Sequence, residues 1–187
     1  MTDELLLNLR LLGTIATIIA VLIAVLIAVW TLKANHNWNR RRYTLGLLED
    51  WNIQTAKHRK TIERLMPGLI DINNTTSQVV ELSVQRATDI YLCTPDNEVN
   101  KGDWELRFSL IELFNYFEII STAWYANIGD RDMIDDSFKD ALLKYHGALK
   151  CYIEVVNKNV DYRPWKPYAD LVAHWQQSKS KGWRKTA

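Results

Sequence analysis

The sequence LLGTIATIIAVLIAVLIAVWTL, from Leu11 to Leu32, contains no charged residue. As an α-helix this stretch would be about 33 Å long, which is enough to cross a hydrocarbon core of about 30 Å. A buried core helix rarely runs this far without a polar residue larger than threonine. A cleaved signal peptide would have an apolar region about half as long, preceded by basic residues, whereas Asp3 and Glu4 stand before this one. The stretch therefore predicts a transmembrane anchor.

Basic residues beside the anchor predict its orientation. Arg10 precedes the apolar stretch, whereas a lysine and then a run of three arginines follow it. Because basic flanks stay on the cytoplasmic side, we expect a single-pass protein of the cell inner membrane, with the N-terminus outside and the C-terminal domain in the cytoplasm. The residues expected at the membrane surface are Trp30, Lys33, Arg40, Arg41 and Arg42.

Alanine recurs at every fourth position within the anchor and forms a ridge of small side chains: Ala16, Ala20, Ala24 and Ala28. Small residues at this spacing let two membrane helices approach closely. One interpretation is therefore that the anchor pairs with a second copy or with another membrane helix. The other interpretation is that alanine is ordinary filler in a membrane helix, and the sequence leaves both open.

The net charge of +1 conceals an uneven distribution after the anchor of residues 1–33. The juxtamembrane stalk of residues 34–66 is basic, and together with Lys33 it has eight basic and three acidic residues. Residues 67–178, expected to be an acidic helical domain that packs with the stalk, have ten basic and seventeen acidic residues. The tail of residues 179–187 has four basic residues and no acidic one.

This charge pattern bears on the partners. A basic stalk suits the anionic surface of a bilayer. The acidic domain lacks the basic face that a nucleic-acid-binding domain needs on its body. We therefore expect the lipid bilayer and a protein as partners, the protein being either a different chain or a second copy in a homo-oligomer, and we expect no nucleic acid.

Glycine and proline are scarce, with seven and four in the chain, and the segments between them are long. This favours an all-α fold: one transmembrane helix followed by a cytoplasmic bundle of about five helices. The stalk helix should run from Arg40 to the Pro67-Gly68 pair, which stops it. The next helix should begin at Thr75 or Thr76, where Thr75-x-x-Gln78 has the form of a capping box.

The most apolar helix after the anchor is expected to open at Gly102-Asp103 and to end at Gly129. Its apolar residues step by three and four, which predicts a packing seam and a central position in the bundle. The residues of this seam are Leu106, Leu110, Leu113, Phe117, Ile120 and Trp124.

The remaining boundaries follow from turn and capping residues. The sequence of residues 94–97, TPDN, predicts a turn before the central helix. Asp132 is expected to cap the helix after Gly129, with Asp135 and Asp136 in its first turn, where carboxylates meet the positive end of the helix dipole. Pro164 is expected to be the first residue of a short last helix.

The stretch LFNYFEIISTAWYANIGDRDMIDDSF, followed by Tyr145 and a late tryptophan-rich segment, resembles a family of uncharacterised bacterial and phage proteins. These proteins join a single membrane helix to a small helical domain of unknown function. The resemblance covers roughly residues 40–178, and the residues that carry it are Phe117, Glu118, Gly129, Asp132 and Trp175. It implies the same architecture and, as a possible role, a prophage-type factor that affects how phages enter the cell or how the host defends itself. It implies no catalytic residue.

Groups that could carry chemistry are sparse. The four histidines, His36, His58, His146 and His174, lie far apart, and none forms the spacing that places two metal ligands on one helix face. The acidic residues after Gly129 lack the alternating ligand positions of a calcium-binding loop, so capping and a solvated helix face explain them better. We expect no cofactor and no metal site.

Glu112 and Glu118 interrupt the apolar central helix. Six residues apart, they point in directions that differ by about 120°, so they cannot form a paired-carboxylate site on their own helix. A buried glutamate needs a partner, and the candidates for structural ion pairs are Arg86, Arg107 and Lys150.

The sequence thus predicts a membrane-anchored cytoplasmic helical interaction protein without an evident catalytic site. The alternative is an enzyme that acts at the inner-membrane surface with Glu112, Glu118 or His146 in its site. For His146, which lies on a core-facing helix, a satisfied buried histidine is the more ordinary interpretation.

Overall fold

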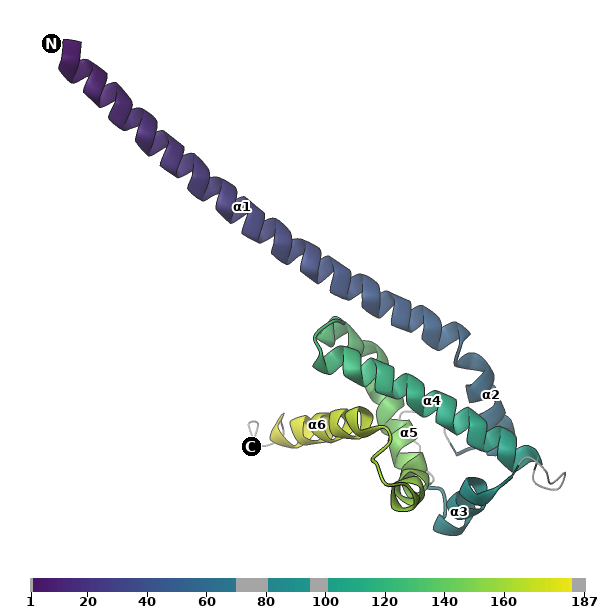
Figure 1. The fold of residues 1–187 in the computed structure, drawn as a ribbon. Helices are drawn as coiled ribbons and strands as arrows, with labels where there is room; N and C mark the ends of the chain where they lie inside the picture. The colour runs from purple at the N-terminus through teal and green to yellow at the C-terminus, as the bar shows by residue number, and fades with distance from the viewer. Residues whose placement is uncertain (1, 70–80, 95–100, 183–187) are drawn as a thin grey trace. The chain divides into compact units, whose positions relative to one another are not determined.

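The computed structural model describes residues 2–69, 81–94 and 101–182 and is all-helical in these ranges, which confirms the predicted fold class (Figure 1). Its helices are α1 (Thr2–Ile53), α2 (Ala56–Leu65), α3 (Val84–Leu92), α4 (Lys101–Tyr125), α5 (Arg131–Asn159) and α6 (Lys166–Gly182). The predicted capping box at Thr75 and Gln78, and residues 95–97 of the predicted turn, lie outside the described ranges.

The chain consists of two compact units, Met1–Arg42 and Tyr43–Ala187. The first is made of α1 alone, and its side chains from Leu12 to Asn39 are all exposed. Within the described residues, α1 is the one helix that is long and apolar enough to cross a membrane, by its length and composition. The second unit contains the last residues of α1 together with α2 to α6.

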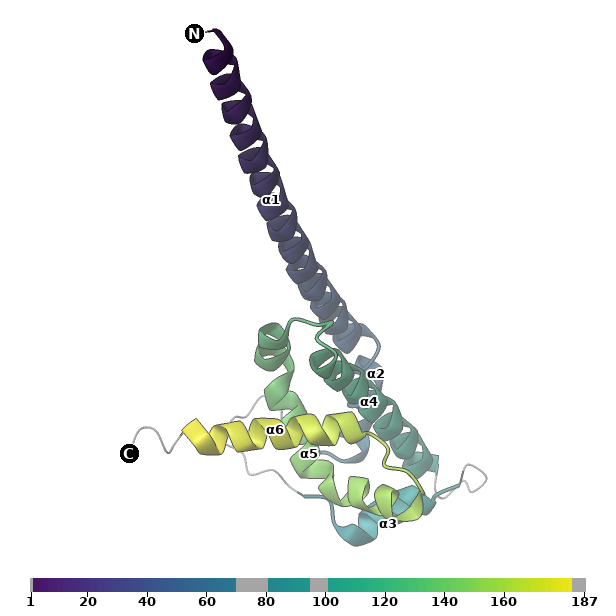
Figure 2. The same cartoon turned by 60° about the vertical axis from the view of Figure 1, so that its left-hand side comes forward.

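The prediction that the most apolar helix is central is confirmed. Within the second unit α4 contacts α2, α3, α5 and α6 (Figure 2). Five residues of its predicted seam, from Leu106 to Ile120, are fully buried, and Trp124 is half-buried. The three-and-four spacing therefore identifies the face that meets the core.

The predicted stalk helix is wrong in its length, because α1 ends at Ile53 and α2 begins at Ala56. At the break the Thr55 hydroxyl lies 2.5 Å from the Trp51 carbonyl oxygen, and Arg59 donates to the same oxygen at 3.1 Å. The Arg59 guanidinium also lies 4.4 Å from the centre of the Trp51 ring. Side chains thus donate to a carbonyl oxygen that, in an unbroken helix, would accept from the backbone amide four residues later.

The predicted cap of α5 is also wrong. The N-cap is Asp130, whose carboxylate accepts from the Met133 amide at 3.3 Å, and Asp132 lies within the first turn. The chain turns through Asn127, which has a φ of 58°, and the amide of Asp130 donates to the Thr44 hydroxyl at 2.9 Å. A residue distant in sequence therefore helps to set which aspartate caps the helix.

The last helix begins two residues later than predicted, at Lys166, so Pro164 lies before it. Trp165, between them, has a φ of 58°, in the left-handed region that a large side chain rarely adopts. Its ring is nevertheless buried. Surrounding contacts must therefore hold this backbone conformation in place.

The α5 helix departs from helical geometry at Leu149, with φ −110° and ψ 15°. The carbonyl of the preceding residue, Ala148, accepts at 2.9 Å from the amide of Leu82, which lies just before α3. An inserted donor of this kind is a recognised cause of a helix kink. The hydrogen bond at the kink therefore links the segment before α3 to α5.

Candidate functional site

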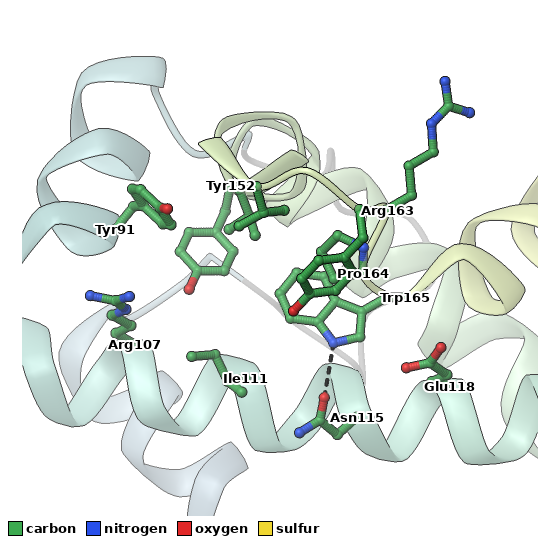
Figure 3. A pocket seen from close by; sticks show the side chains of 12 residues that line it. Tyr91, Arg107, Ile111, Asn115, Glu118, Tyr152, Arg163, Pro164 and Trp165 are labelled. Carbon is green, nitrogen blue, oxygen red and sulfur yellow. Dashed lines mark hydrogen bonds between the residues drawn. The ribbon is translucent and has the colours of Figure 1, made fainter. Parts of the chain in front are cut away.

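A pocket of about 430 Å³ lies along α4 in the second unit (Figure 3). Its floor is formed by three turns of α4, from Arg107 at one end to Glu118 at the other, a distance of about 16 Å along the helix axis. The walls come from Tyr91 of α3, from α5, and from residues 160–165 before α6. Its volume is within the range of small-molecule sites.

Trp165 and Asn115 form one wall of the pocket. The indole N–H of Trp165 donates to Oδ1 of Asn115 at 3.0 Å, and the Trp165 ring lies 4.8 Å from that of Phe114. Because an indole only donates, this bond fixes which way the Asn115 amide is turned. The amide N–H groups of Asn115 are left for another acceptor. Trp165, whose backbone is strained, is therefore itself a part of the pocket wall.

Arg107 marks the other end of the pocket. Its guanidinium donates to the Cys93 carbonyl at 3.1 Å and lies 5.2 Å from the centre of the Tyr91 ring. No carboxylate among the described residues pairs with it, in contrast to Arg86, which forms a two-pronged ion pair with Asp103. Part of its hydrogen-bonding capacity remains available, since a guanidinium has five donors.

Tyr152 of α5 places its hydroxyl in the pocket from the wall opposite α4 (Figure 3). Its ring is fully buried and stacks on Phe114, with ring centres 6.3 Å apart. Within the described part of the chain the hydroxyl has no hydrogen-bond partner. Burial raises the pKa of Tyr152 to about 12, and Arg107 partly opposes this rise. The group is therefore a neutral donor at physiological pH.

The structure does not bring the three candidates for catalysis together. Glu118 lines the pocket, whereas Glu112 and His146 do not. His146 packs edge-on against Tyr168, with ring centres 5.7 Å apart. Burial, with the positive charge of Lys150, lowers the pKa of His146.

The suggested ion pairs of the glutamates are wrong for the residues that the structure describes. Arg86 pairs with Asp103, Arg107 binds the Cys93 carbonyl, and no ion pair there joins Lys150 to Glu112 or Glu118. Both glutamates are only half-buried, so each remains partly hydrated and needs no cationic partner.

The other residues singled out in the sequence take positions on α1 or at the start of α5. The anchor residues Leu11, Ala16, Ala20, Ala24, Ala28 and Leu32, and the surface residues Trp30, Lys33, Arg40, Arg41 and Arg42, all lie on α1. Asp135, expected to face the helix dipole, accepts hydrogen bonds from two indoles, and Asp130 caps α5. These two carboxylates therefore have structural roles.

The pocket residues Asn115, Tyr152 and Trp165 were not identified as a site from the sequence. Tyr152 and Trp165 are large aromatic residues of the kind that usually packs in a core, and Asn115 belongs to no motif. The three belong to α4, α5 and the segment before α6. The one local signal is the backbone of Trp165, which sequence patterns do not reveal.

A family model described as a domain of unknown function (DUF4760) matches residues 18–175. The match includes the later part of the apolar segment of α1 and most of the second unit, and it agrees with the resemblance as far as a domain of unknown function. No curated protein and no solved structure matches the chain.

Proposed function

We propose that this chain, which belongs to the DUF4760 family of domains of unknown function, is a single-pass inner-membrane protein whose cytoplasmic helical domain acts by binding. The observation that carries the proposal is the exposed apolar surface of α1. All side chains from Leu12 to Leu32 are exposed in the first unit, and nearly all are apolar. Exposing a contiguous apolar surface of this extent to water is unfavourable, and insertion into a bilayer would cover it.

The orientation rests on the charges around α1. Lys33 and the run Arg40 to Arg42 follow the apolar segment, and this favours a cytoplasmic second unit. Trp30 and Lys33 then lie at the membrane surface, with the arginines close to anionic head groups. The acidic charge of residues 67–178 keeps the helical domain away from the same surface and from nucleic acid.

The partner is a protein, either another chain or a second copy of this one. As a more specific role, we propose a prophage-type factor that affects how phages enter the cell or how the host defends itself. This role rests on the resemblance of the central stretch to bacterial and phage proteins. Its test is the efficiency of plaque formation by a phage panel on cells that express the chain. Equal plaque counts with and without expression would contradict it.

Topology is tested with reporters fused after Ala187, so that α6, which extends to Gly182, stays whole. A reporter that folds only in the cytoplasm should be active, and one that works only in the periplasm should be silent. Deletion of residues 12–32 should release the fusion into the soluble fraction. A fusion active only in the periplasm would overturn the orientation.

The alternative is an enzyme at the inner-membrane surface, and the observation in its favour is that Glu118 lines the pocket. Glu118→Gln, Glu112→Gln and His146→Gln separate the two proposals, since all three variants should keep any phenotype of a binding protein. An enzyme would lose its phenotype with Glu118→Gln while the variant remained folded.

A further inference from the structure

We infer that the Arg107 end of the pocket on α4 is a binding subsite for the carboxylate of a small aromatic acid. This inference goes beyond the proposed membrane-anchored role, because it concerns a small organic ligand and holds for either orientation of the anchor. It rests on two donor groups, Arg107 and Tyr152, and on the rings beside them.

Tyr152 provides the first argument. A tyrosine hydroxyl in a buried position normally has a hydrogen-bond partner. Tyr152 is fully buried, yet its hydroxyl lacks a partner among the described residues and points into the pocket toward α4 (Figure 3). Because the hydroxyl faces the pocket, it meets water there in the absence of a ligand, and an acceptor atom of a ligand can take the place of that water. Because burial raises its pKa to about 12, the hydroxyl donates and does not carry a charge.

Arg107 provides the second argument, because it supplies a positive charge that no described carboxylate neutralises. The Cys93 carbonyl and the Tyr91 ring hold the guanidinium near the Tyr152 side of the pocket. Arg107 and Tyr152 thus present a charged and a neutral donor to the same space, which is the arrangement that a carboxylate needs.

Asn115 lies just over two turns along the same helix from Arg107, about 12 Å away, and so belongs to the Glu118 end of the pocket. Its oxygen accepts from the indole of Trp165, and its amide nitrogen points away from the cavity (Figure 3), so Asn115 holds the Trp165 wall in place and is not a donor to the carboxylate. Arg163 also belongs to the lining, but its side chain points away from the cavity (Figure 3). One cation therefore faces the ligand, and its charge matches a monoanion.

The remaining walls select the body of the ligand. Flat or apolar surfaces lie between the two ends of the pocket: Tyr91, Ile111, Val156, Pro164 and Trp165. Aromatic rings prefer such neighbours, in offset or edge-on arrangements. Glu118, at the far end, disfavours a dianion such as a phosphate monoester. Together these features favour an aromatic carboxylate.

The test is isothermal titration calorimetry of the full chain in detergent micelles with phenylacetate, its neutral analogue phenylacetamide, and phenyl phosphate. We expect phenylacetate to bind at least about tenfold more tightly than phenylacetamide, because only the acid makes charge-assisted bonds. Phenyl phosphate should bind more weakly than phenylacetate. Equal affinity for acid and amide, tighter binding of the phosphate, or no binding of phenylacetate would each overturn the inference.

Variants separate binding from folding. Tyr152→Phe removes a hydroxyl without a protein partner, so it should weaken phenylacetate binding about three- to tenfold while leaving the melting temperature unchanged or higher. Arg107→Met should abolish binding. Binding by Tyr152→Phe at the wild-type affinity would overturn the inference even if Arg107→Met fails to fold.

Two matched controls accompany these variants. Tyr168→Phe removes a buried hydroxyl outside the pocket, which donates to the Leu142 carbonyl at 2.9 Å, so it should lower the melting temperature and keep the affinity for phenylacetate. Glu112→Gln changes a carboxylate of α4 that does not line the pocket and should bind phenylacetate as well as wild type does. A loss of affinity in both controls equal to that of Tyr152→Phe would contradict a subsite at Arg107.

Discussion

The indole N–H of Trp175, near the middle of α6, donates to Oδ1 of Asp135 on α5 at 3.0 Å. Trp124 of α4 donates to the same oxygen at 2.9 Å. One carboxylate oxygen therefore joins three helices, and Trp175 is buried, with 1% of its surface exposed. A buried indole N–H cannot turn to water when its acceptor is lost.

We predict that Asp135→Ala destabilises the helical domain by about 2–4 kcal/mol, because two donors lose a charged acceptor and one of them is buried. Asp135→Asn keeps an oxygen acceptor and should fall between wild type and Asp135→Ala. The control is Asp136→Ala, an exposed carboxylate in the same helical turn, which should cost at most about 1 kcal/mol through the helix dipole. Chemical denaturation followed by circular dichroism measures the differences, and equal losses for Asp135→Ala and Asp136→Ala would contradict the structural role of the shared oxygen.

Features that depend on apolar periodicity were predictable from the sequence. The seam of α4 gave its central position, because a three-and-four spacing of large apolar residues leaves one face to bury. The uncharged apolar run in α1 likewise predicted a helix long enough to cross a membrane, because its length at the helical rise per residue matches the thickness of a hydrocarbon core.

Features that depend on contacts between distant residues were not predictable. Four aspartates lie within seven residues after Gly129, and the choice of Asp130 as the cap depends on the turn at Asn127 and on Thr44. The break after Ile53 depends on Thr55 and Arg59, neither of which is a helix-stopping residue type. The pocket could not be predicted either, because its donors come from separate helices and carry no common motif.

Gly129 should tolerate no larger residue. A Cβ at this position would lie 2.6 Å from Cδ1 of Ile134, which is fully buried, and 3.3 Å from the Thr44 hydroxyl oxygen. Gly129→Ala should therefore destabilise the protein by about 1–3 kcal/mol through overpacking. The control Gly46→Ala, at an exposed helical position with no atom within 4 Å, should stabilise by up to about 1 kcal/mol.

The same clash can be tested with a second substitution. Ile134→Val removes the Cδ1 atom that the new Cβ would meet, so Gly129→Ala should cost less in an Ile134→Val background than in wild type. A double-mutant cycle measures this coupling, which we expect to be about 0.5–2 kcal/mol. Additive effects would show that Ile134 does not cause the strain.

His146 should make the stability depend on pH in the acidic range. Burial lowers its folded-state pKa below the ordinary value of 6.5. Between the folded-state pKa and about 6.5 the unfolded chain binds more protons, so the free energy of unfolding falls as the pH drops through this window. His146→Gln should reduce the loss of melting temperature between pH 7.5 and pH 5.5. Above pH 7.5 the curves of the two proteins should run parallel, and identical slopes at all pH values would contradict the prediction.

The helical domain should fold without the anchor if the last residues of α1 are kept. The Trp51 ring lies 5.8 Å from that of Phe117 and 6.2 Å from that of Phe138, and the Tyr116 hydroxyl donates to the Leu47 carbonyl. We therefore expect fragment 43–187 to show a cooperative thermal transition in circular dichroism. Fragment 56–187, which lacks these contacts, should melt at a lower temperature or without cooperativity. Equal melting of both fragments would mean that the end of α1 is not part of the core.

The alanine ridge of α1 should mediate pairing of two anchors. Lipid provides no hydrophobic drive between helices, so close packing along small residues has to supply the attraction. Ala20→Leu or Ala24→Leu would hold two helices apart while the segment stays apolar enough to insert. Leu22→Ile and Leu26→Ile are the controls, since each lies about 200° around the helix from the alanine two residues earlier and keeps its volume. In a membrane two-hybrid assay we expect the leucine substitutions to reduce self-association and the isoleucine substitutions to leave it unchanged. If both sets behave alike, or if the wild-type chain does not self-associate, the ridge is filler and any pairing of this protein has to come from its helical domain.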